Sequence, residues 1–410
     1  MHRLVIIGSL HENVQLVIEA KKRGYYTIVC DGYNDGAAKR FADKVYNIDI
    51  RKVDEIAEIC ENEKADGIIG SFSDLVFEQI TKIADKAKLK WYATPEMLQY
   101  YRDKNLQKEL LKKLGILTPK HMLVTPELSD DDYLSFVYPV LIKPINSWGS
   151  RNITVFYDPS ELKKFIDGRH YDLFEIEEYC DAYEYNCISW VVDGAVKILG
   201  IADRERNPKE TGTVQMLNRV VYPSVLYDEL YDKVLTVLQR FVNSTGQKSG
   251  PLSMQFFYKN NQIVVCEIAG RVLAHEHKLI KMCNGSDINS LLLDYVYGDD
   301  NAVRRDIKPI DIEKYSCGLY FQCEKQKLVY DTSAADELLS KIDDDSKLIF
   351  CEKNEIFDDS HPYYARVYLC ADTRKKLDDE TEFLFENMCV KDNNNHNIII
   401  PFYLEGRYKL

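Results

Sequence analysis

Short apolar segments alternate with amphipathic ones over the first 95 residues, and this alternation limits the fold more than any other feature. Apolar runs that end at Gly or Asp predict strands near residues 4–8, 26–30, 45–48 and 67–70. Apolar residues at helical spacing predict helices between them, over 14–24 and 53–63. Strands that alternate with helices in this way form a parallel, doubly wound sheet of the Rossmann-like type.

Polar residues at the carboxyl ends of such strands are candidate substrate contacts, because parallel α/β sheets bind their ligands at that edge. Ser9, Asp31 and Asp74 occupy these positions. Gly8 follows the first strand without a G-x-G-x-x-G motif, which argues against a nicotinamide dinucleotide cofactor. We therefore expect a small-molecule crevice at this edge.

The character of the chain changes after Thr94-Pro95, where a charged helix and then a series of antiparallel strands are predicted. A chain of 410 residues exceeds the ~250 residues at which single cores stop growing. The predicted organisation is a Rossmann-like domain over residues 1–95, an α+β domain over 96–300 and a small α+β segment over 301–410. We expect the last segment to form a lid or a dimer contact.

Charge and composition argue against several classes of partner and site. The formal net charge of −13 argues against binding to nucleic acid or anionic membranes. The amino terminus starts with an apolar strand and no apolar stretch approaches ~18 residues, so we expect a cytoplasmic protein. The 11 cysteines contain no C-x-x-C pair, which favours reduced thiols over zinc ligands or disulfides.

Two lysines occupy informative positions. Lys143 ends a mostly apolar strand that starts at Pro139, where a charged ammonium needs an anionic partner to offset its desolvation. A bound phosphate would supply that partner. Lys104 follows Asp103 at the start of the charged helix, where a surface cation is the plainer interpretation.

A loop of small and polar residues follows Lys143. Its Ser147, Gly149 and Ser150 would let backbone amides approach phosphate oxygens closely, and Arg151 ends the loop. A flap over a ligand and a plain turn between two strands explain this composition equally well.

Acidic residues gather at the end of another predicted strand, at Glu177 and Glu178, and Tyr179 follows them. This segment would suit a hinge that presents backbone groups to a purine ring, with Glu184 accepting hydrogen bonds from ribose hydroxyls. Solvated carboxylates are the alternative explanation.

Gln255 and Glu267 belong to the two strands of one predicted hairpin, and Arg271 follows. Facing amide and carboxylate oxygens near an arginine suit Mg²⁺ held partly by protein and partly by nucleotide phosphates. Charged strand ends are the alternative. His275 and His277 have no third ligand nearby, which favours polar surface over a metal site there.

Taken in order, these segments closely resemble the ATP-grasp superfamily. The resemblance rests on Asp103-Lys104, Tyr138–Arg151, Glu177–Glu184, Gln255 and Glu267–Arg271. The loop after Lys143 is similar to that of the carbamoyl-phosphate synthase large chain, and the amino-terminal sheet resembles that of biotin carboxylase and purine-pathway members. The resemblance covers residues 1 to about 300 and implies an ATP-grasp fold of two α+β subdomains.

The resemblance implies that this chain binds ATP. Lys104 and Lys143 would hold the nucleotide phosphates, and the loop Ser147–Arg151 would close over them. Glu177–Tyr179 and Glu184 would bind adenosine.

The resemblance also implies a metal site and a catalytic arginine. Gln255 and Glu267 would ligate Mg²⁺, with Mn²⁺ as an alternative ion. Arg271, with Lys143, would stabilise the transferred phosphoryl group, and His275 is a further candidate substrate contact.

Three positions depart from the family pattern. Ala269 replaces an Asn that often supplies one more oxygen ligand, so the departure puts turnover in doubt. Gln255 replaces a Glu found in many relatives, although carbamoyl-phosphate synthases also use Gln there. Trp148 stands in the loop where small residues are usual.

The expected activity is that of a ligase, which converts a small carboxylate to an acyl phosphate with ATP and passes it to an amine. A bicarbonate-dependent carboxylase of an amine and a non-catalytic ATP-binding module are the alternatives. A free-standing carbamoyl-phosphate synthase is disfavoured, because that enzyme needs two grasp halves and this chain has one. A homodimer is a family expectation.

Overall fold

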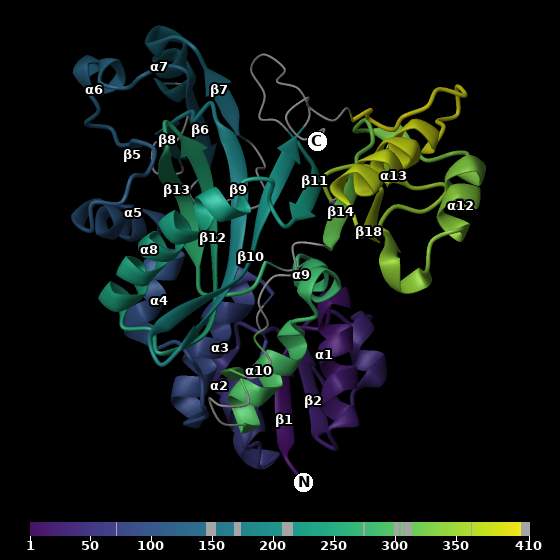
Figure 1. Cartoon of the computed structure of the whole chain (residues 1–410). Coiled ribbons are helices and arrows are strands. Elements are labelled where there is room, and N and C mark those ends of the chain that lie inside the picture. The colour runs from purple at the N-terminus through teal and green to yellow at the C-terminus, as the bar shows by residue number, and fades with distance from the viewer. Residues whose placement is uncertain are drawn as a thin grey trace.

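The computed structural model describes residues 1–70, 72–144, 153–167, 174–206, 216–273, 275–298, 303–304, 307, 314–361 and 363–402. A parallel sheet at the amino terminus precedes a small and a large antiparallel sheet. Figure 1 shows the amino-terminal sheet at the bottom, the small sheet at the upper left and the carboxyl-terminal segment at the right. No helix within the described ranges is long and apolar enough to span a membrane.

The amino-terminal sheet has the strand order β3-β2-β1-β4, with every pair parallel. Its elements are β1 (Arg3–Ile7), α1 (His11–Lys22), β2 (Tyr26–Asp31), β3 (Lys44–Asn47), α2 (Val53–Asn62), β4 (Gly67–Ile69) and α3 (Asp74–Ala87). Leu4 and Ile6 enter one core while Val5 and Ile7 enter another, so both faces of β1 are buried. Burial on both faces explains the continuous apolar strands, and the predicted doubly wound sheet is confirmed.

A helix from much later in the chain completes this part of the molecule. Helix α10 (Ile288–Tyr297) packs on α1 and β4 (Figure 1). Tyr297 Oη donates a hydrogen bond of 2.9 Å to Asp66, and a side chain at Gly67 would collide with Val296 and Tyr297. The amino-terminal sheet is therefore joined to the segment that precedes the predicted boundary at residue 300.

The change of character after Thr94 coincides with two capped helices. Helix α4 (Pro95–Arg102) begins with Pro95, and the Thr94 side chain accepts a hydrogen bond from the Met97 amide. Helix α5 (Lys104–Lys113) follows at once, because Asp103 caps it through the amides of Asn105 and Leu106. Asp103 therefore explains the sharp turn between the two helices.

The small sheet has the order β5-β8-β6-β7 and is antiparallel throughout. Its elements are β5 (His121–Leu123), α6 (Asp130–Leu134), β6 (Val140–Pro144), β7 (Thr154–Phe156), α7 (Pro159–Asp167) and β8 (Phe174–Glu178). Alternate residues of β6, Val140 and Ile142, lie in a separate apolar core under α6 and α7. Lys143 therefore points to the opposite face of the strand.

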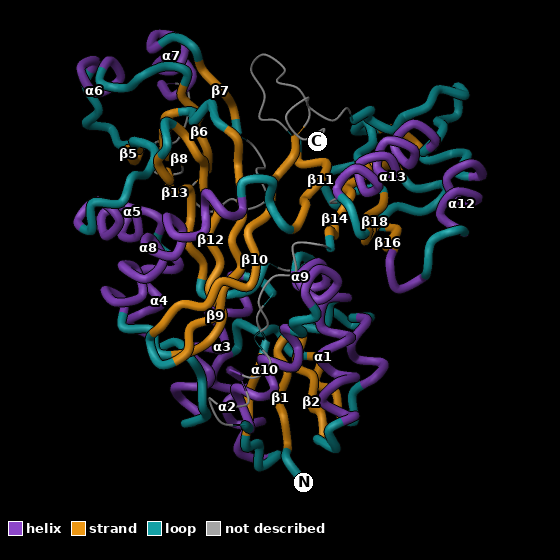
Figure 2. Tube along the Cα trace, in the orientation of Figure 1, coloured by secondary structure: helices purple, strands orange, loops and turns teal. Residues whose placement is uncertain are grey.

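The large sheet has eight strands in the order β13-β12-β9-β10-β11-β14-β18-β16. Its strands are β9 (Tyr183–Val192), β10 (Ala195–Arg206), β11 (Leu217–Tyr222), β12 (Ser249–Lys259), β13 (Gln262–Ala269), β14 (Tyr315–Phe321), β16 (Lys347–Ile349) and β18 (Ala365–Ala371). Figure 2 shows the long strands β9, β10 and β12 beside one another, and helix α8 (Tyr227–Thr245) packs on β10. The sheet crosses the predicted boundary at residue 300, because β11 pairs with β14.

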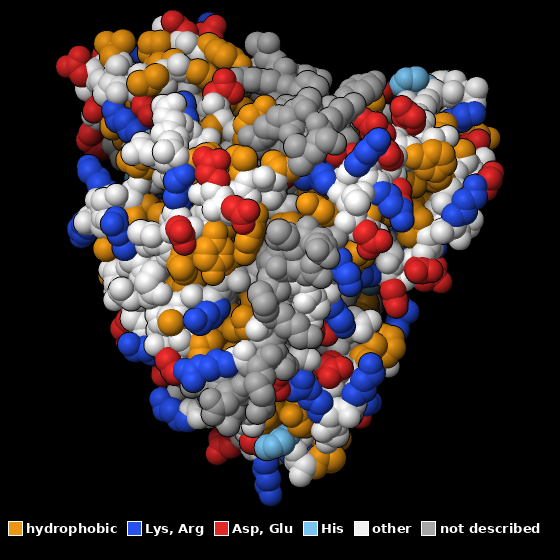
Figure 3. All heavy atoms as spheres, in the orientation of Figure 1, with side chains coloured by type: hydrophobic (Ala, Val, Ile, Leu, Met, Phe, Trp, Pro, Cys, Tyr) orange, Lys and Arg blue, Asp and Glu red, His pale blue; other side chains and the backbone are white. Residues whose placement is uncertain are grey.

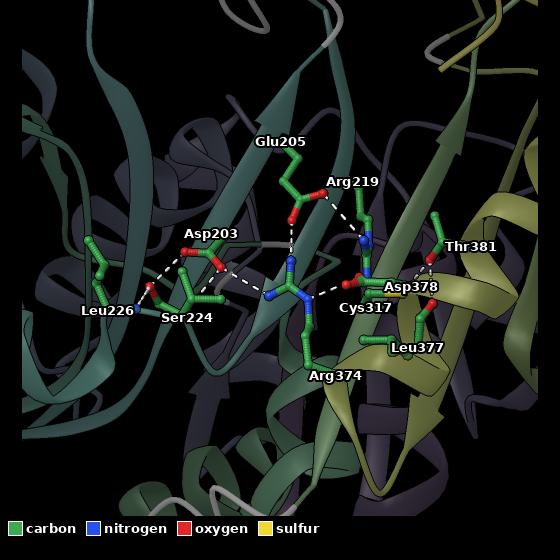
Figure 4. A network of polar contacts seen from close by, with 11 residues as sticks. Asp203, Glu205, Arg219, Ser224, Leu226, Cys317, Arg374, Leu377, Asp378 and Thr381 are labelled. Atoms are coloured by element: carbon green, nitrogen blue, oxygen red, sulfur yellow. Dashed lines mark hydrogen bonds and ion pairs between the residues drawn. The ribbon is translucent and has the colours of Figure 1, made fainter. Parts of the chain in front are cut away.

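The carboxyl-terminal segment adds α12 (Ser333–Ser340), the short pair β15 (Lys327–Leu328) and β17 (Ile356–Phe357), and α13 (Arg374–Asn387). A buried ionic network joins it to the preceding strands (Figure 4). Arg374 of α13 contacts Asp203 and Glu205 of β10, and Arg219 of β11 reaches Asp378 of α13 at 2.6 Å. The segment is thus held by sheet pairing and by buried charge.

On the face in Figure 3, basic and acidic side chains are interspersed.

Candidate active site

Two lysines from different elements meet buried carboxylates on the inner face of the small sheet. Lys143 Nζ lies 3.2 Å from Glu175 Oε1 and 2.9 Å from Glu177 Oε2, because β6 and β8 pair with Lys143 opposite Glu175. Lys108 of α5 also contacts Glu177 and is 3% exposed. The expectation that Lys143 needs an anionic partner is met here by carboxylates.

Opposing charges keep this cluster ionised. Burial acts to raise the pKa of Glu177, but the ammonium groups of Lys143 and Lys108 outweigh it and hold that pKa at about 2. Burial also acts to lower the pKa of Lys143, and the carboxylates of Glu177 and Glu175 raise it well above its ordinary value. Both partners, Glu177 and Lys143, are therefore charged at neutral pH.

The sequence patterns pointed to Lys104 at the start of α5 and not to Lys108 on the same helix. Lys104 is half-buried at the first turn of α5, whereas Lys108 lies one turn later on the face that carries Gln107 and Leu111 inward. The four-residue spacing was the available signal, because residues i and i+4 share a helix face. Lys108 is an additional candidate phosphate ligand, and the role of Lys104 stays a prediction.

His121 of β5 borders the lysine pair. Its Nε2 lies 3.0 Å from Asn105 Oδ1. Burial, with repulsion from Lys108, lowers the pKa of His121 to about 4 against the attraction of nearby carboxylates. The imidazole is therefore neutral where the cluster is charged.

Replacing His121 with glutamine is expected to flatten the acid dependence of folding stability. The unfolded chain binds a proton at His121 near pH 6.5, but the folded chain binds it only near pH 4. The stabilisation from neutral His121 is thus complete above pH 6.5 and is lost as the pH falls toward 4. Urea unfolding of wild type and His121→Gln at about pH 7 and about pH 5 measures this. His11→Gln, at an exposed site, is the control, and an equal acid loss in His121→Gln would refute the assignment.

The predicted adenosine segment is fixed to its neighbours. The amide of Glu178 donates to the Lys120 carbonyl at 2.9 Å, and the amide of Tyr179 donates to the Pro139 carbonyl at 3.0 Å. Glu178 Oε1 also accepts from the Val137 amide. These two amides are therefore engaged within the protein, and the contact of this segment with adenosine stays a prediction.

Glu184 lies beside the predicted metal ligand Gln255. The Gln255 amide donates to Glu184 Oε1, and Arg204 Nε lies 2.7 Å from the same oxygen. Arg206 also contacts Glu184, which is 2% exposed. Neither Arg204 nor Arg206 belongs to a motif that the sequence revealed.

The predicted metal ligands are adjacent. Gln255 of β12 pairs directly with Glu267 of β13. Cross-strand partners lie close enough for both side chains to contact one ion. Ala269, two residues on, lies opposite Ser253 and offers no oxygen, so these two oxygen donors form the described part of the site.

Two predicted residues from distant parts of the chain form one ion pair. Arg271 Nε and Nη2 donate to the two carboxylate oxygens of Asp74 at 2.6 and 2.7 Å. Burial acts to raise the pKa of Asp74, but Arg271 lowers it below its ordinary value. Two parallel hydrogen bonds fix the orientation of the guanidinium. Asp74, at the start of α3, thus orients Arg271, which follows β13 of the large sheet.

Ser9 and Asp31 meet at the carboxyl edge of the parallel sheet, as expected. Ser9 Oγ donates to Asp31 Oδ2 at 2.9 Å, and the Tyr33 amide donates to Oδ1. A cavity of about 590 Å³ opens at this edge. Its lining includes the carboxylates of Asp31, Glu12 and Asp49 and one cationic side chain, Arg51. The crevice therefore offers several carboxylates.

His275 follows β13 and lies close to Tyr320 of β14 and Arg366 of β18. Its ring packs on Tyr320 of β14 with centroids 5.1 Å apart. His275 Nε2, Tyr320 Oη and Arg366 Nε of β18 have no hydrogen-bond partner among the described residues. Burial, followed by the charges of Arg366 and Arg204, lowers the pKa of His275 well below its ordinary value. Buried polar atoms without partners fit a site completed by a ligand.

His277 packs against Phe72 with ring centroids 5.0 Å apart. Neither His275 nor His277 belongs to a group of metal-ligating residues in the described part of the chain. The residues Ser147, Trp148, Gly149, Ser150 and Arg151 lie outside the described residues, and their roles stay predictions.

Curated sequence relatives include the carbamoyl phosphate synthase large chain of Clostridium acetobutylicum, 26% identical over 263 residues, which are 61% of this chain and 24% of that protein. The formate-dependent phosphoribosylglycinamide formyltransferase of Prochlorococcus marinus is 22% identical over 281 residues, 66% of this chain and 70% of that protein. The chain thus spans about a quarter of the first relative. No family model matches it.

Solved structures share the fold over nearly the whole chain. The L-amino acid ligase from Bacillus licheniformis superposes with a TM-score of 0.79 at 15% identity, covering 96% of this chain and 99% of that one. The biotin carboxylase domain dimer of the Hydrogenobacter thermophilus 2-oxoglutarate carboxylase, complexed with MgADP and bicarbonate, gives 0.71 at 16% identity, covering 96% and 91%. This chain therefore has the fold of these solved enzymes, and its sequence is similar to the carbamoyl phosphate synthase large chain and the formyltransferase.

Proposed function

We propose that this chain is an ATP-dependent ligase that activates a small carboxylate as an acyl phosphate for attack by an amine. The observation that carries the proposal is the buried pair of ammonium groups, Lys143 and Lys108, which share the carboxylate of Glu177. Two fixed cations on one face of a small sheet suit the phosphates of a nucleotide. The kinship with ligases supports the same activity.

The residues present fit Mg-ATP. Lys143 and Lys108 would contact the phosphates. Glu184 would accept hydrogen bonds from the ribose once its carboxylate separates from Arg204 or Arg206. Gln255 and Glu267 supply amide and carboxylate oxygens on paired strands, the ligand type that Mg²⁺ prefers. Mn²⁺ is an alternative for the same oxygen set. The ion would neutralise charge on the phosphates.

Arg271 would act on the transferred phosphoryl group, with Asp74 as the residue that positions it. A substrate carboxylate oxygen attacks the γ-phosphorus, the bond to the β,γ-bridging oxygen breaks, and ADP leaves. The amine nitrogen then attacks the acyl carbon, the bond between that carbon and the phosphate oxygen breaks, and inorganic phosphate leaves. The proton lost by the amine passes to solvent. Catalysis of this kind rests on positioning and charge neutralisation, so no nucleophilic side chain is required.

The acid and the amine would bind at different places. Arg366 Nε, Tyr320 Oη and His275 Nε2 have no hydrogen-bond partner among the described residues, which suits the carboxylate substrate. Arg366 Nη2 lies 3.2 Å from Glu12, which would hold the guanidinium in place. The cavity with Asp31, Glu12 and Asp49 favours an ammonium group over a phosphorylated amine. This distribution favours the carboxylate–amine ligase over a carboxylase of a phosphorylated amine.

Ala269 motivates the second candidate function, an ATP-binding module without turnover. The position is buried on β13 and offers no oxygen to an ion. Such a module would bind ATP but release no ADP with any mixture of acids and amines.

Release of ADP is expected to require one acid and one amine together. Pools of carboxylic acids and amines are incubated with Mg-ATP and the full chain, and ADP and phosphate are measured. Joint dependence follows because the acyl phosphate persists until an amine attacks it. Stimulation by bicarbonate alone would favour the carboxylase, and ATP binding with silence in all pools would favour the module.

Arg366→Met is expected to raise the KM for the acid by roughly tenfold to a hundredfold, since a charged hydrogen bond contributes about 1.5–3 kcal/mol. ATP binding, followed by thermal shift, should stay unchanged. Arg240→Met on the exposed face of α8 is the matched control. An unchanged KM in Arg366→Met would place the acid elsewhere.

The arrangement of the whole protein completes the proposal. It comprises domains over residues 1–95, 96–300 and 301–410, a cytoplasmic location and a homodimer. It also comprises small-molecule partners rather than nucleic acid or membranes, which the net charge of −13 supports. Light scattering of the purified chain tests the dimer.

A further inference from the structure

Three side chains with different metal-ligating groups meet in the carboxyl-terminal segment. Cys351, Glu355 and His361 each place one ligand atom within 4.8 Å of the other two. They lie on the stretch that runs from the end of β16 through β17, on elements that carry none of the proposed ATP or substrate residues. Cys351 is fully buried, the side chain of His361 is 17% exposed, and Glu355 is exposed.

The backbone around the cluster is held from both sides. The Val329 amide donates to the Glu355 carbonyl at 2.9 Å, and the Asn354 amide donates to the Val329 carbonyl at 2.7 Å. The Phe350 amide donates to the Tyr364 carbonyl. Cys351 and Glu355 are therefore anchored to neighbouring strands before any ligand binds.

The histidine is oriented as a metal ligand would be. His361 Nδ1 lies 3.3 Å from Asp358 Oδ1, and the ring stacks on Phe357. Its Nε2 faces Glu355 Oε2 at 3.7 Å. A histidine that binds metal through one nitrogen usually gives its other N–H to a carboxylate, which fixes the tautomer. Asp358 lies close to that position, and Ser360 Oγ is also 3.3 Å from Nδ1.

Charge and spacing select the class of ion. A thiolate, a carboxylate and a neutral imidazole carry two negative charges, which a divalent cation neutralises. The thiolate excludes Mg²⁺ and Ca²⁺, which prefer oxygen, and favours zinc-type ions. Ligands about 2.0–2.3 Å from a tetrahedral zinc lie roughly 3.4–3.7 Å apart, so the His361–Glu355 separation needs little change.

We propose that Cys351, Glu355 and His361 bind a Zn²⁺-type divalent ion, with water in the fourth position. Binding forms one metal–sulfur, one metal–nitrogen and one metal–oxygen bond, and the thiol proton passes to solvent. The ion ties residues 351–361 together. The ligands follow a C-x3-E-x5-H spacing rather than a C-x-x-C pair, so the proposal departs from the expectation of unliganded thiols at Cys351 alone.

Cobalt reports directly on this site, because thiolate coordination to Co²⁺ produces a charge-transfer absorption band and a tetrahedral site produces visible bands. The reduced full chain, cleared of metal by a chelator, is titrated with Co²⁺ in excess Mg²⁺. We expect both bands to saturate at one equivalent and to bleach when Zn²⁺ is added. Cys351→Ser should lose the charge-transfer band, whereas Cys370→Ser, at an exposed thiol on β18, should retain it.

A second variant covers the case in which Cys351→Ser misfolds. His361→Gln, checked by circular dichroism, should bind Co²⁺ at least tenfold more weakly and keep an altered thiolate band. Absence of a thiolate band in the wild type would overturn the proposal. Wild-type bands and affinity in His361→Gln would equally overturn it, because the metal would then sit elsewhere.

Discussion

Replacing Lys143 with alanine is expected to lower substrate-dependent ADP release by about a hundredfold to a thousandfold, the usual cost of removing one preorganised donor from a developing charge. Lys143 is held by two carboxylates on β8, so its ammonium does not reorganise when phosphate arrives. Lys108 would keep Glu177 neutralised in the variant. Initial rates at saturating acid and amine measure the effect.

The matched control is Lys163→Ala, because Lys163 is an exposed lysine of α7 that pairs with Asp130 of α6. Circular dichroism of both variants separates loss of function from loss of fold. A Lys143→Ala protein that is folded and turns over at the wild-type rate would remove Lys143 from the phosphate site.

Replacing Arg374 with methionine is expected to destabilise the folded chain by about 3–5 kcal/mol, the usual effect of removing one partner from a buried ion pair. Arg374 contacts Asp203 at 3.1 Å and Asp378 at 3.0 Å, and it also contacts Glu205 (Figure 4). Without it, Glu205 and Asp378 share the single guanidinium of Arg219, and Asp203 loses its ion pair. Methionine keeps part of the apolar stem, so the loss reports mainly on charge.

Urea unfolding followed by circular dichroism gives the free energy of unfolding of each variant. Lys376→Ala on the same helix is the control, because Lys376 is exposed and lies 4.0 Å from Glu380. Exposed pairs of this kind contribute less than about 1 kcal/mol. Equal free energies of unfolding for Arg374→Met and wild type would contradict the prediction. The negative charges of the three carboxylates would then be neutralised by protonation or by other cations.

The sequence by itself determined the fold class. Strand and helix periods are local, and they predicted the parallel amino-terminal sheet. The ATP-grasp fold was implied by the resemblance of several motifs to a known family. The apolar strand before Lys143 also predicted that its ammonium would need an anion. The ATP-grasp resemblance is confirmed by relatives and fold.

Only the tertiary structure decided which charges meet. The partners of Lys143 follow from the antiparallel register of β6 and β8, and Lys108 enters the site because α5 turns that face inward. Arg271 finds Asp74 across 197 positions, and Arg374 finds Asp203 across 171. Local periodicity sets backbone geometry, but ion pairs depend on side chains brought together from distant segments, and no local pattern records that proximity.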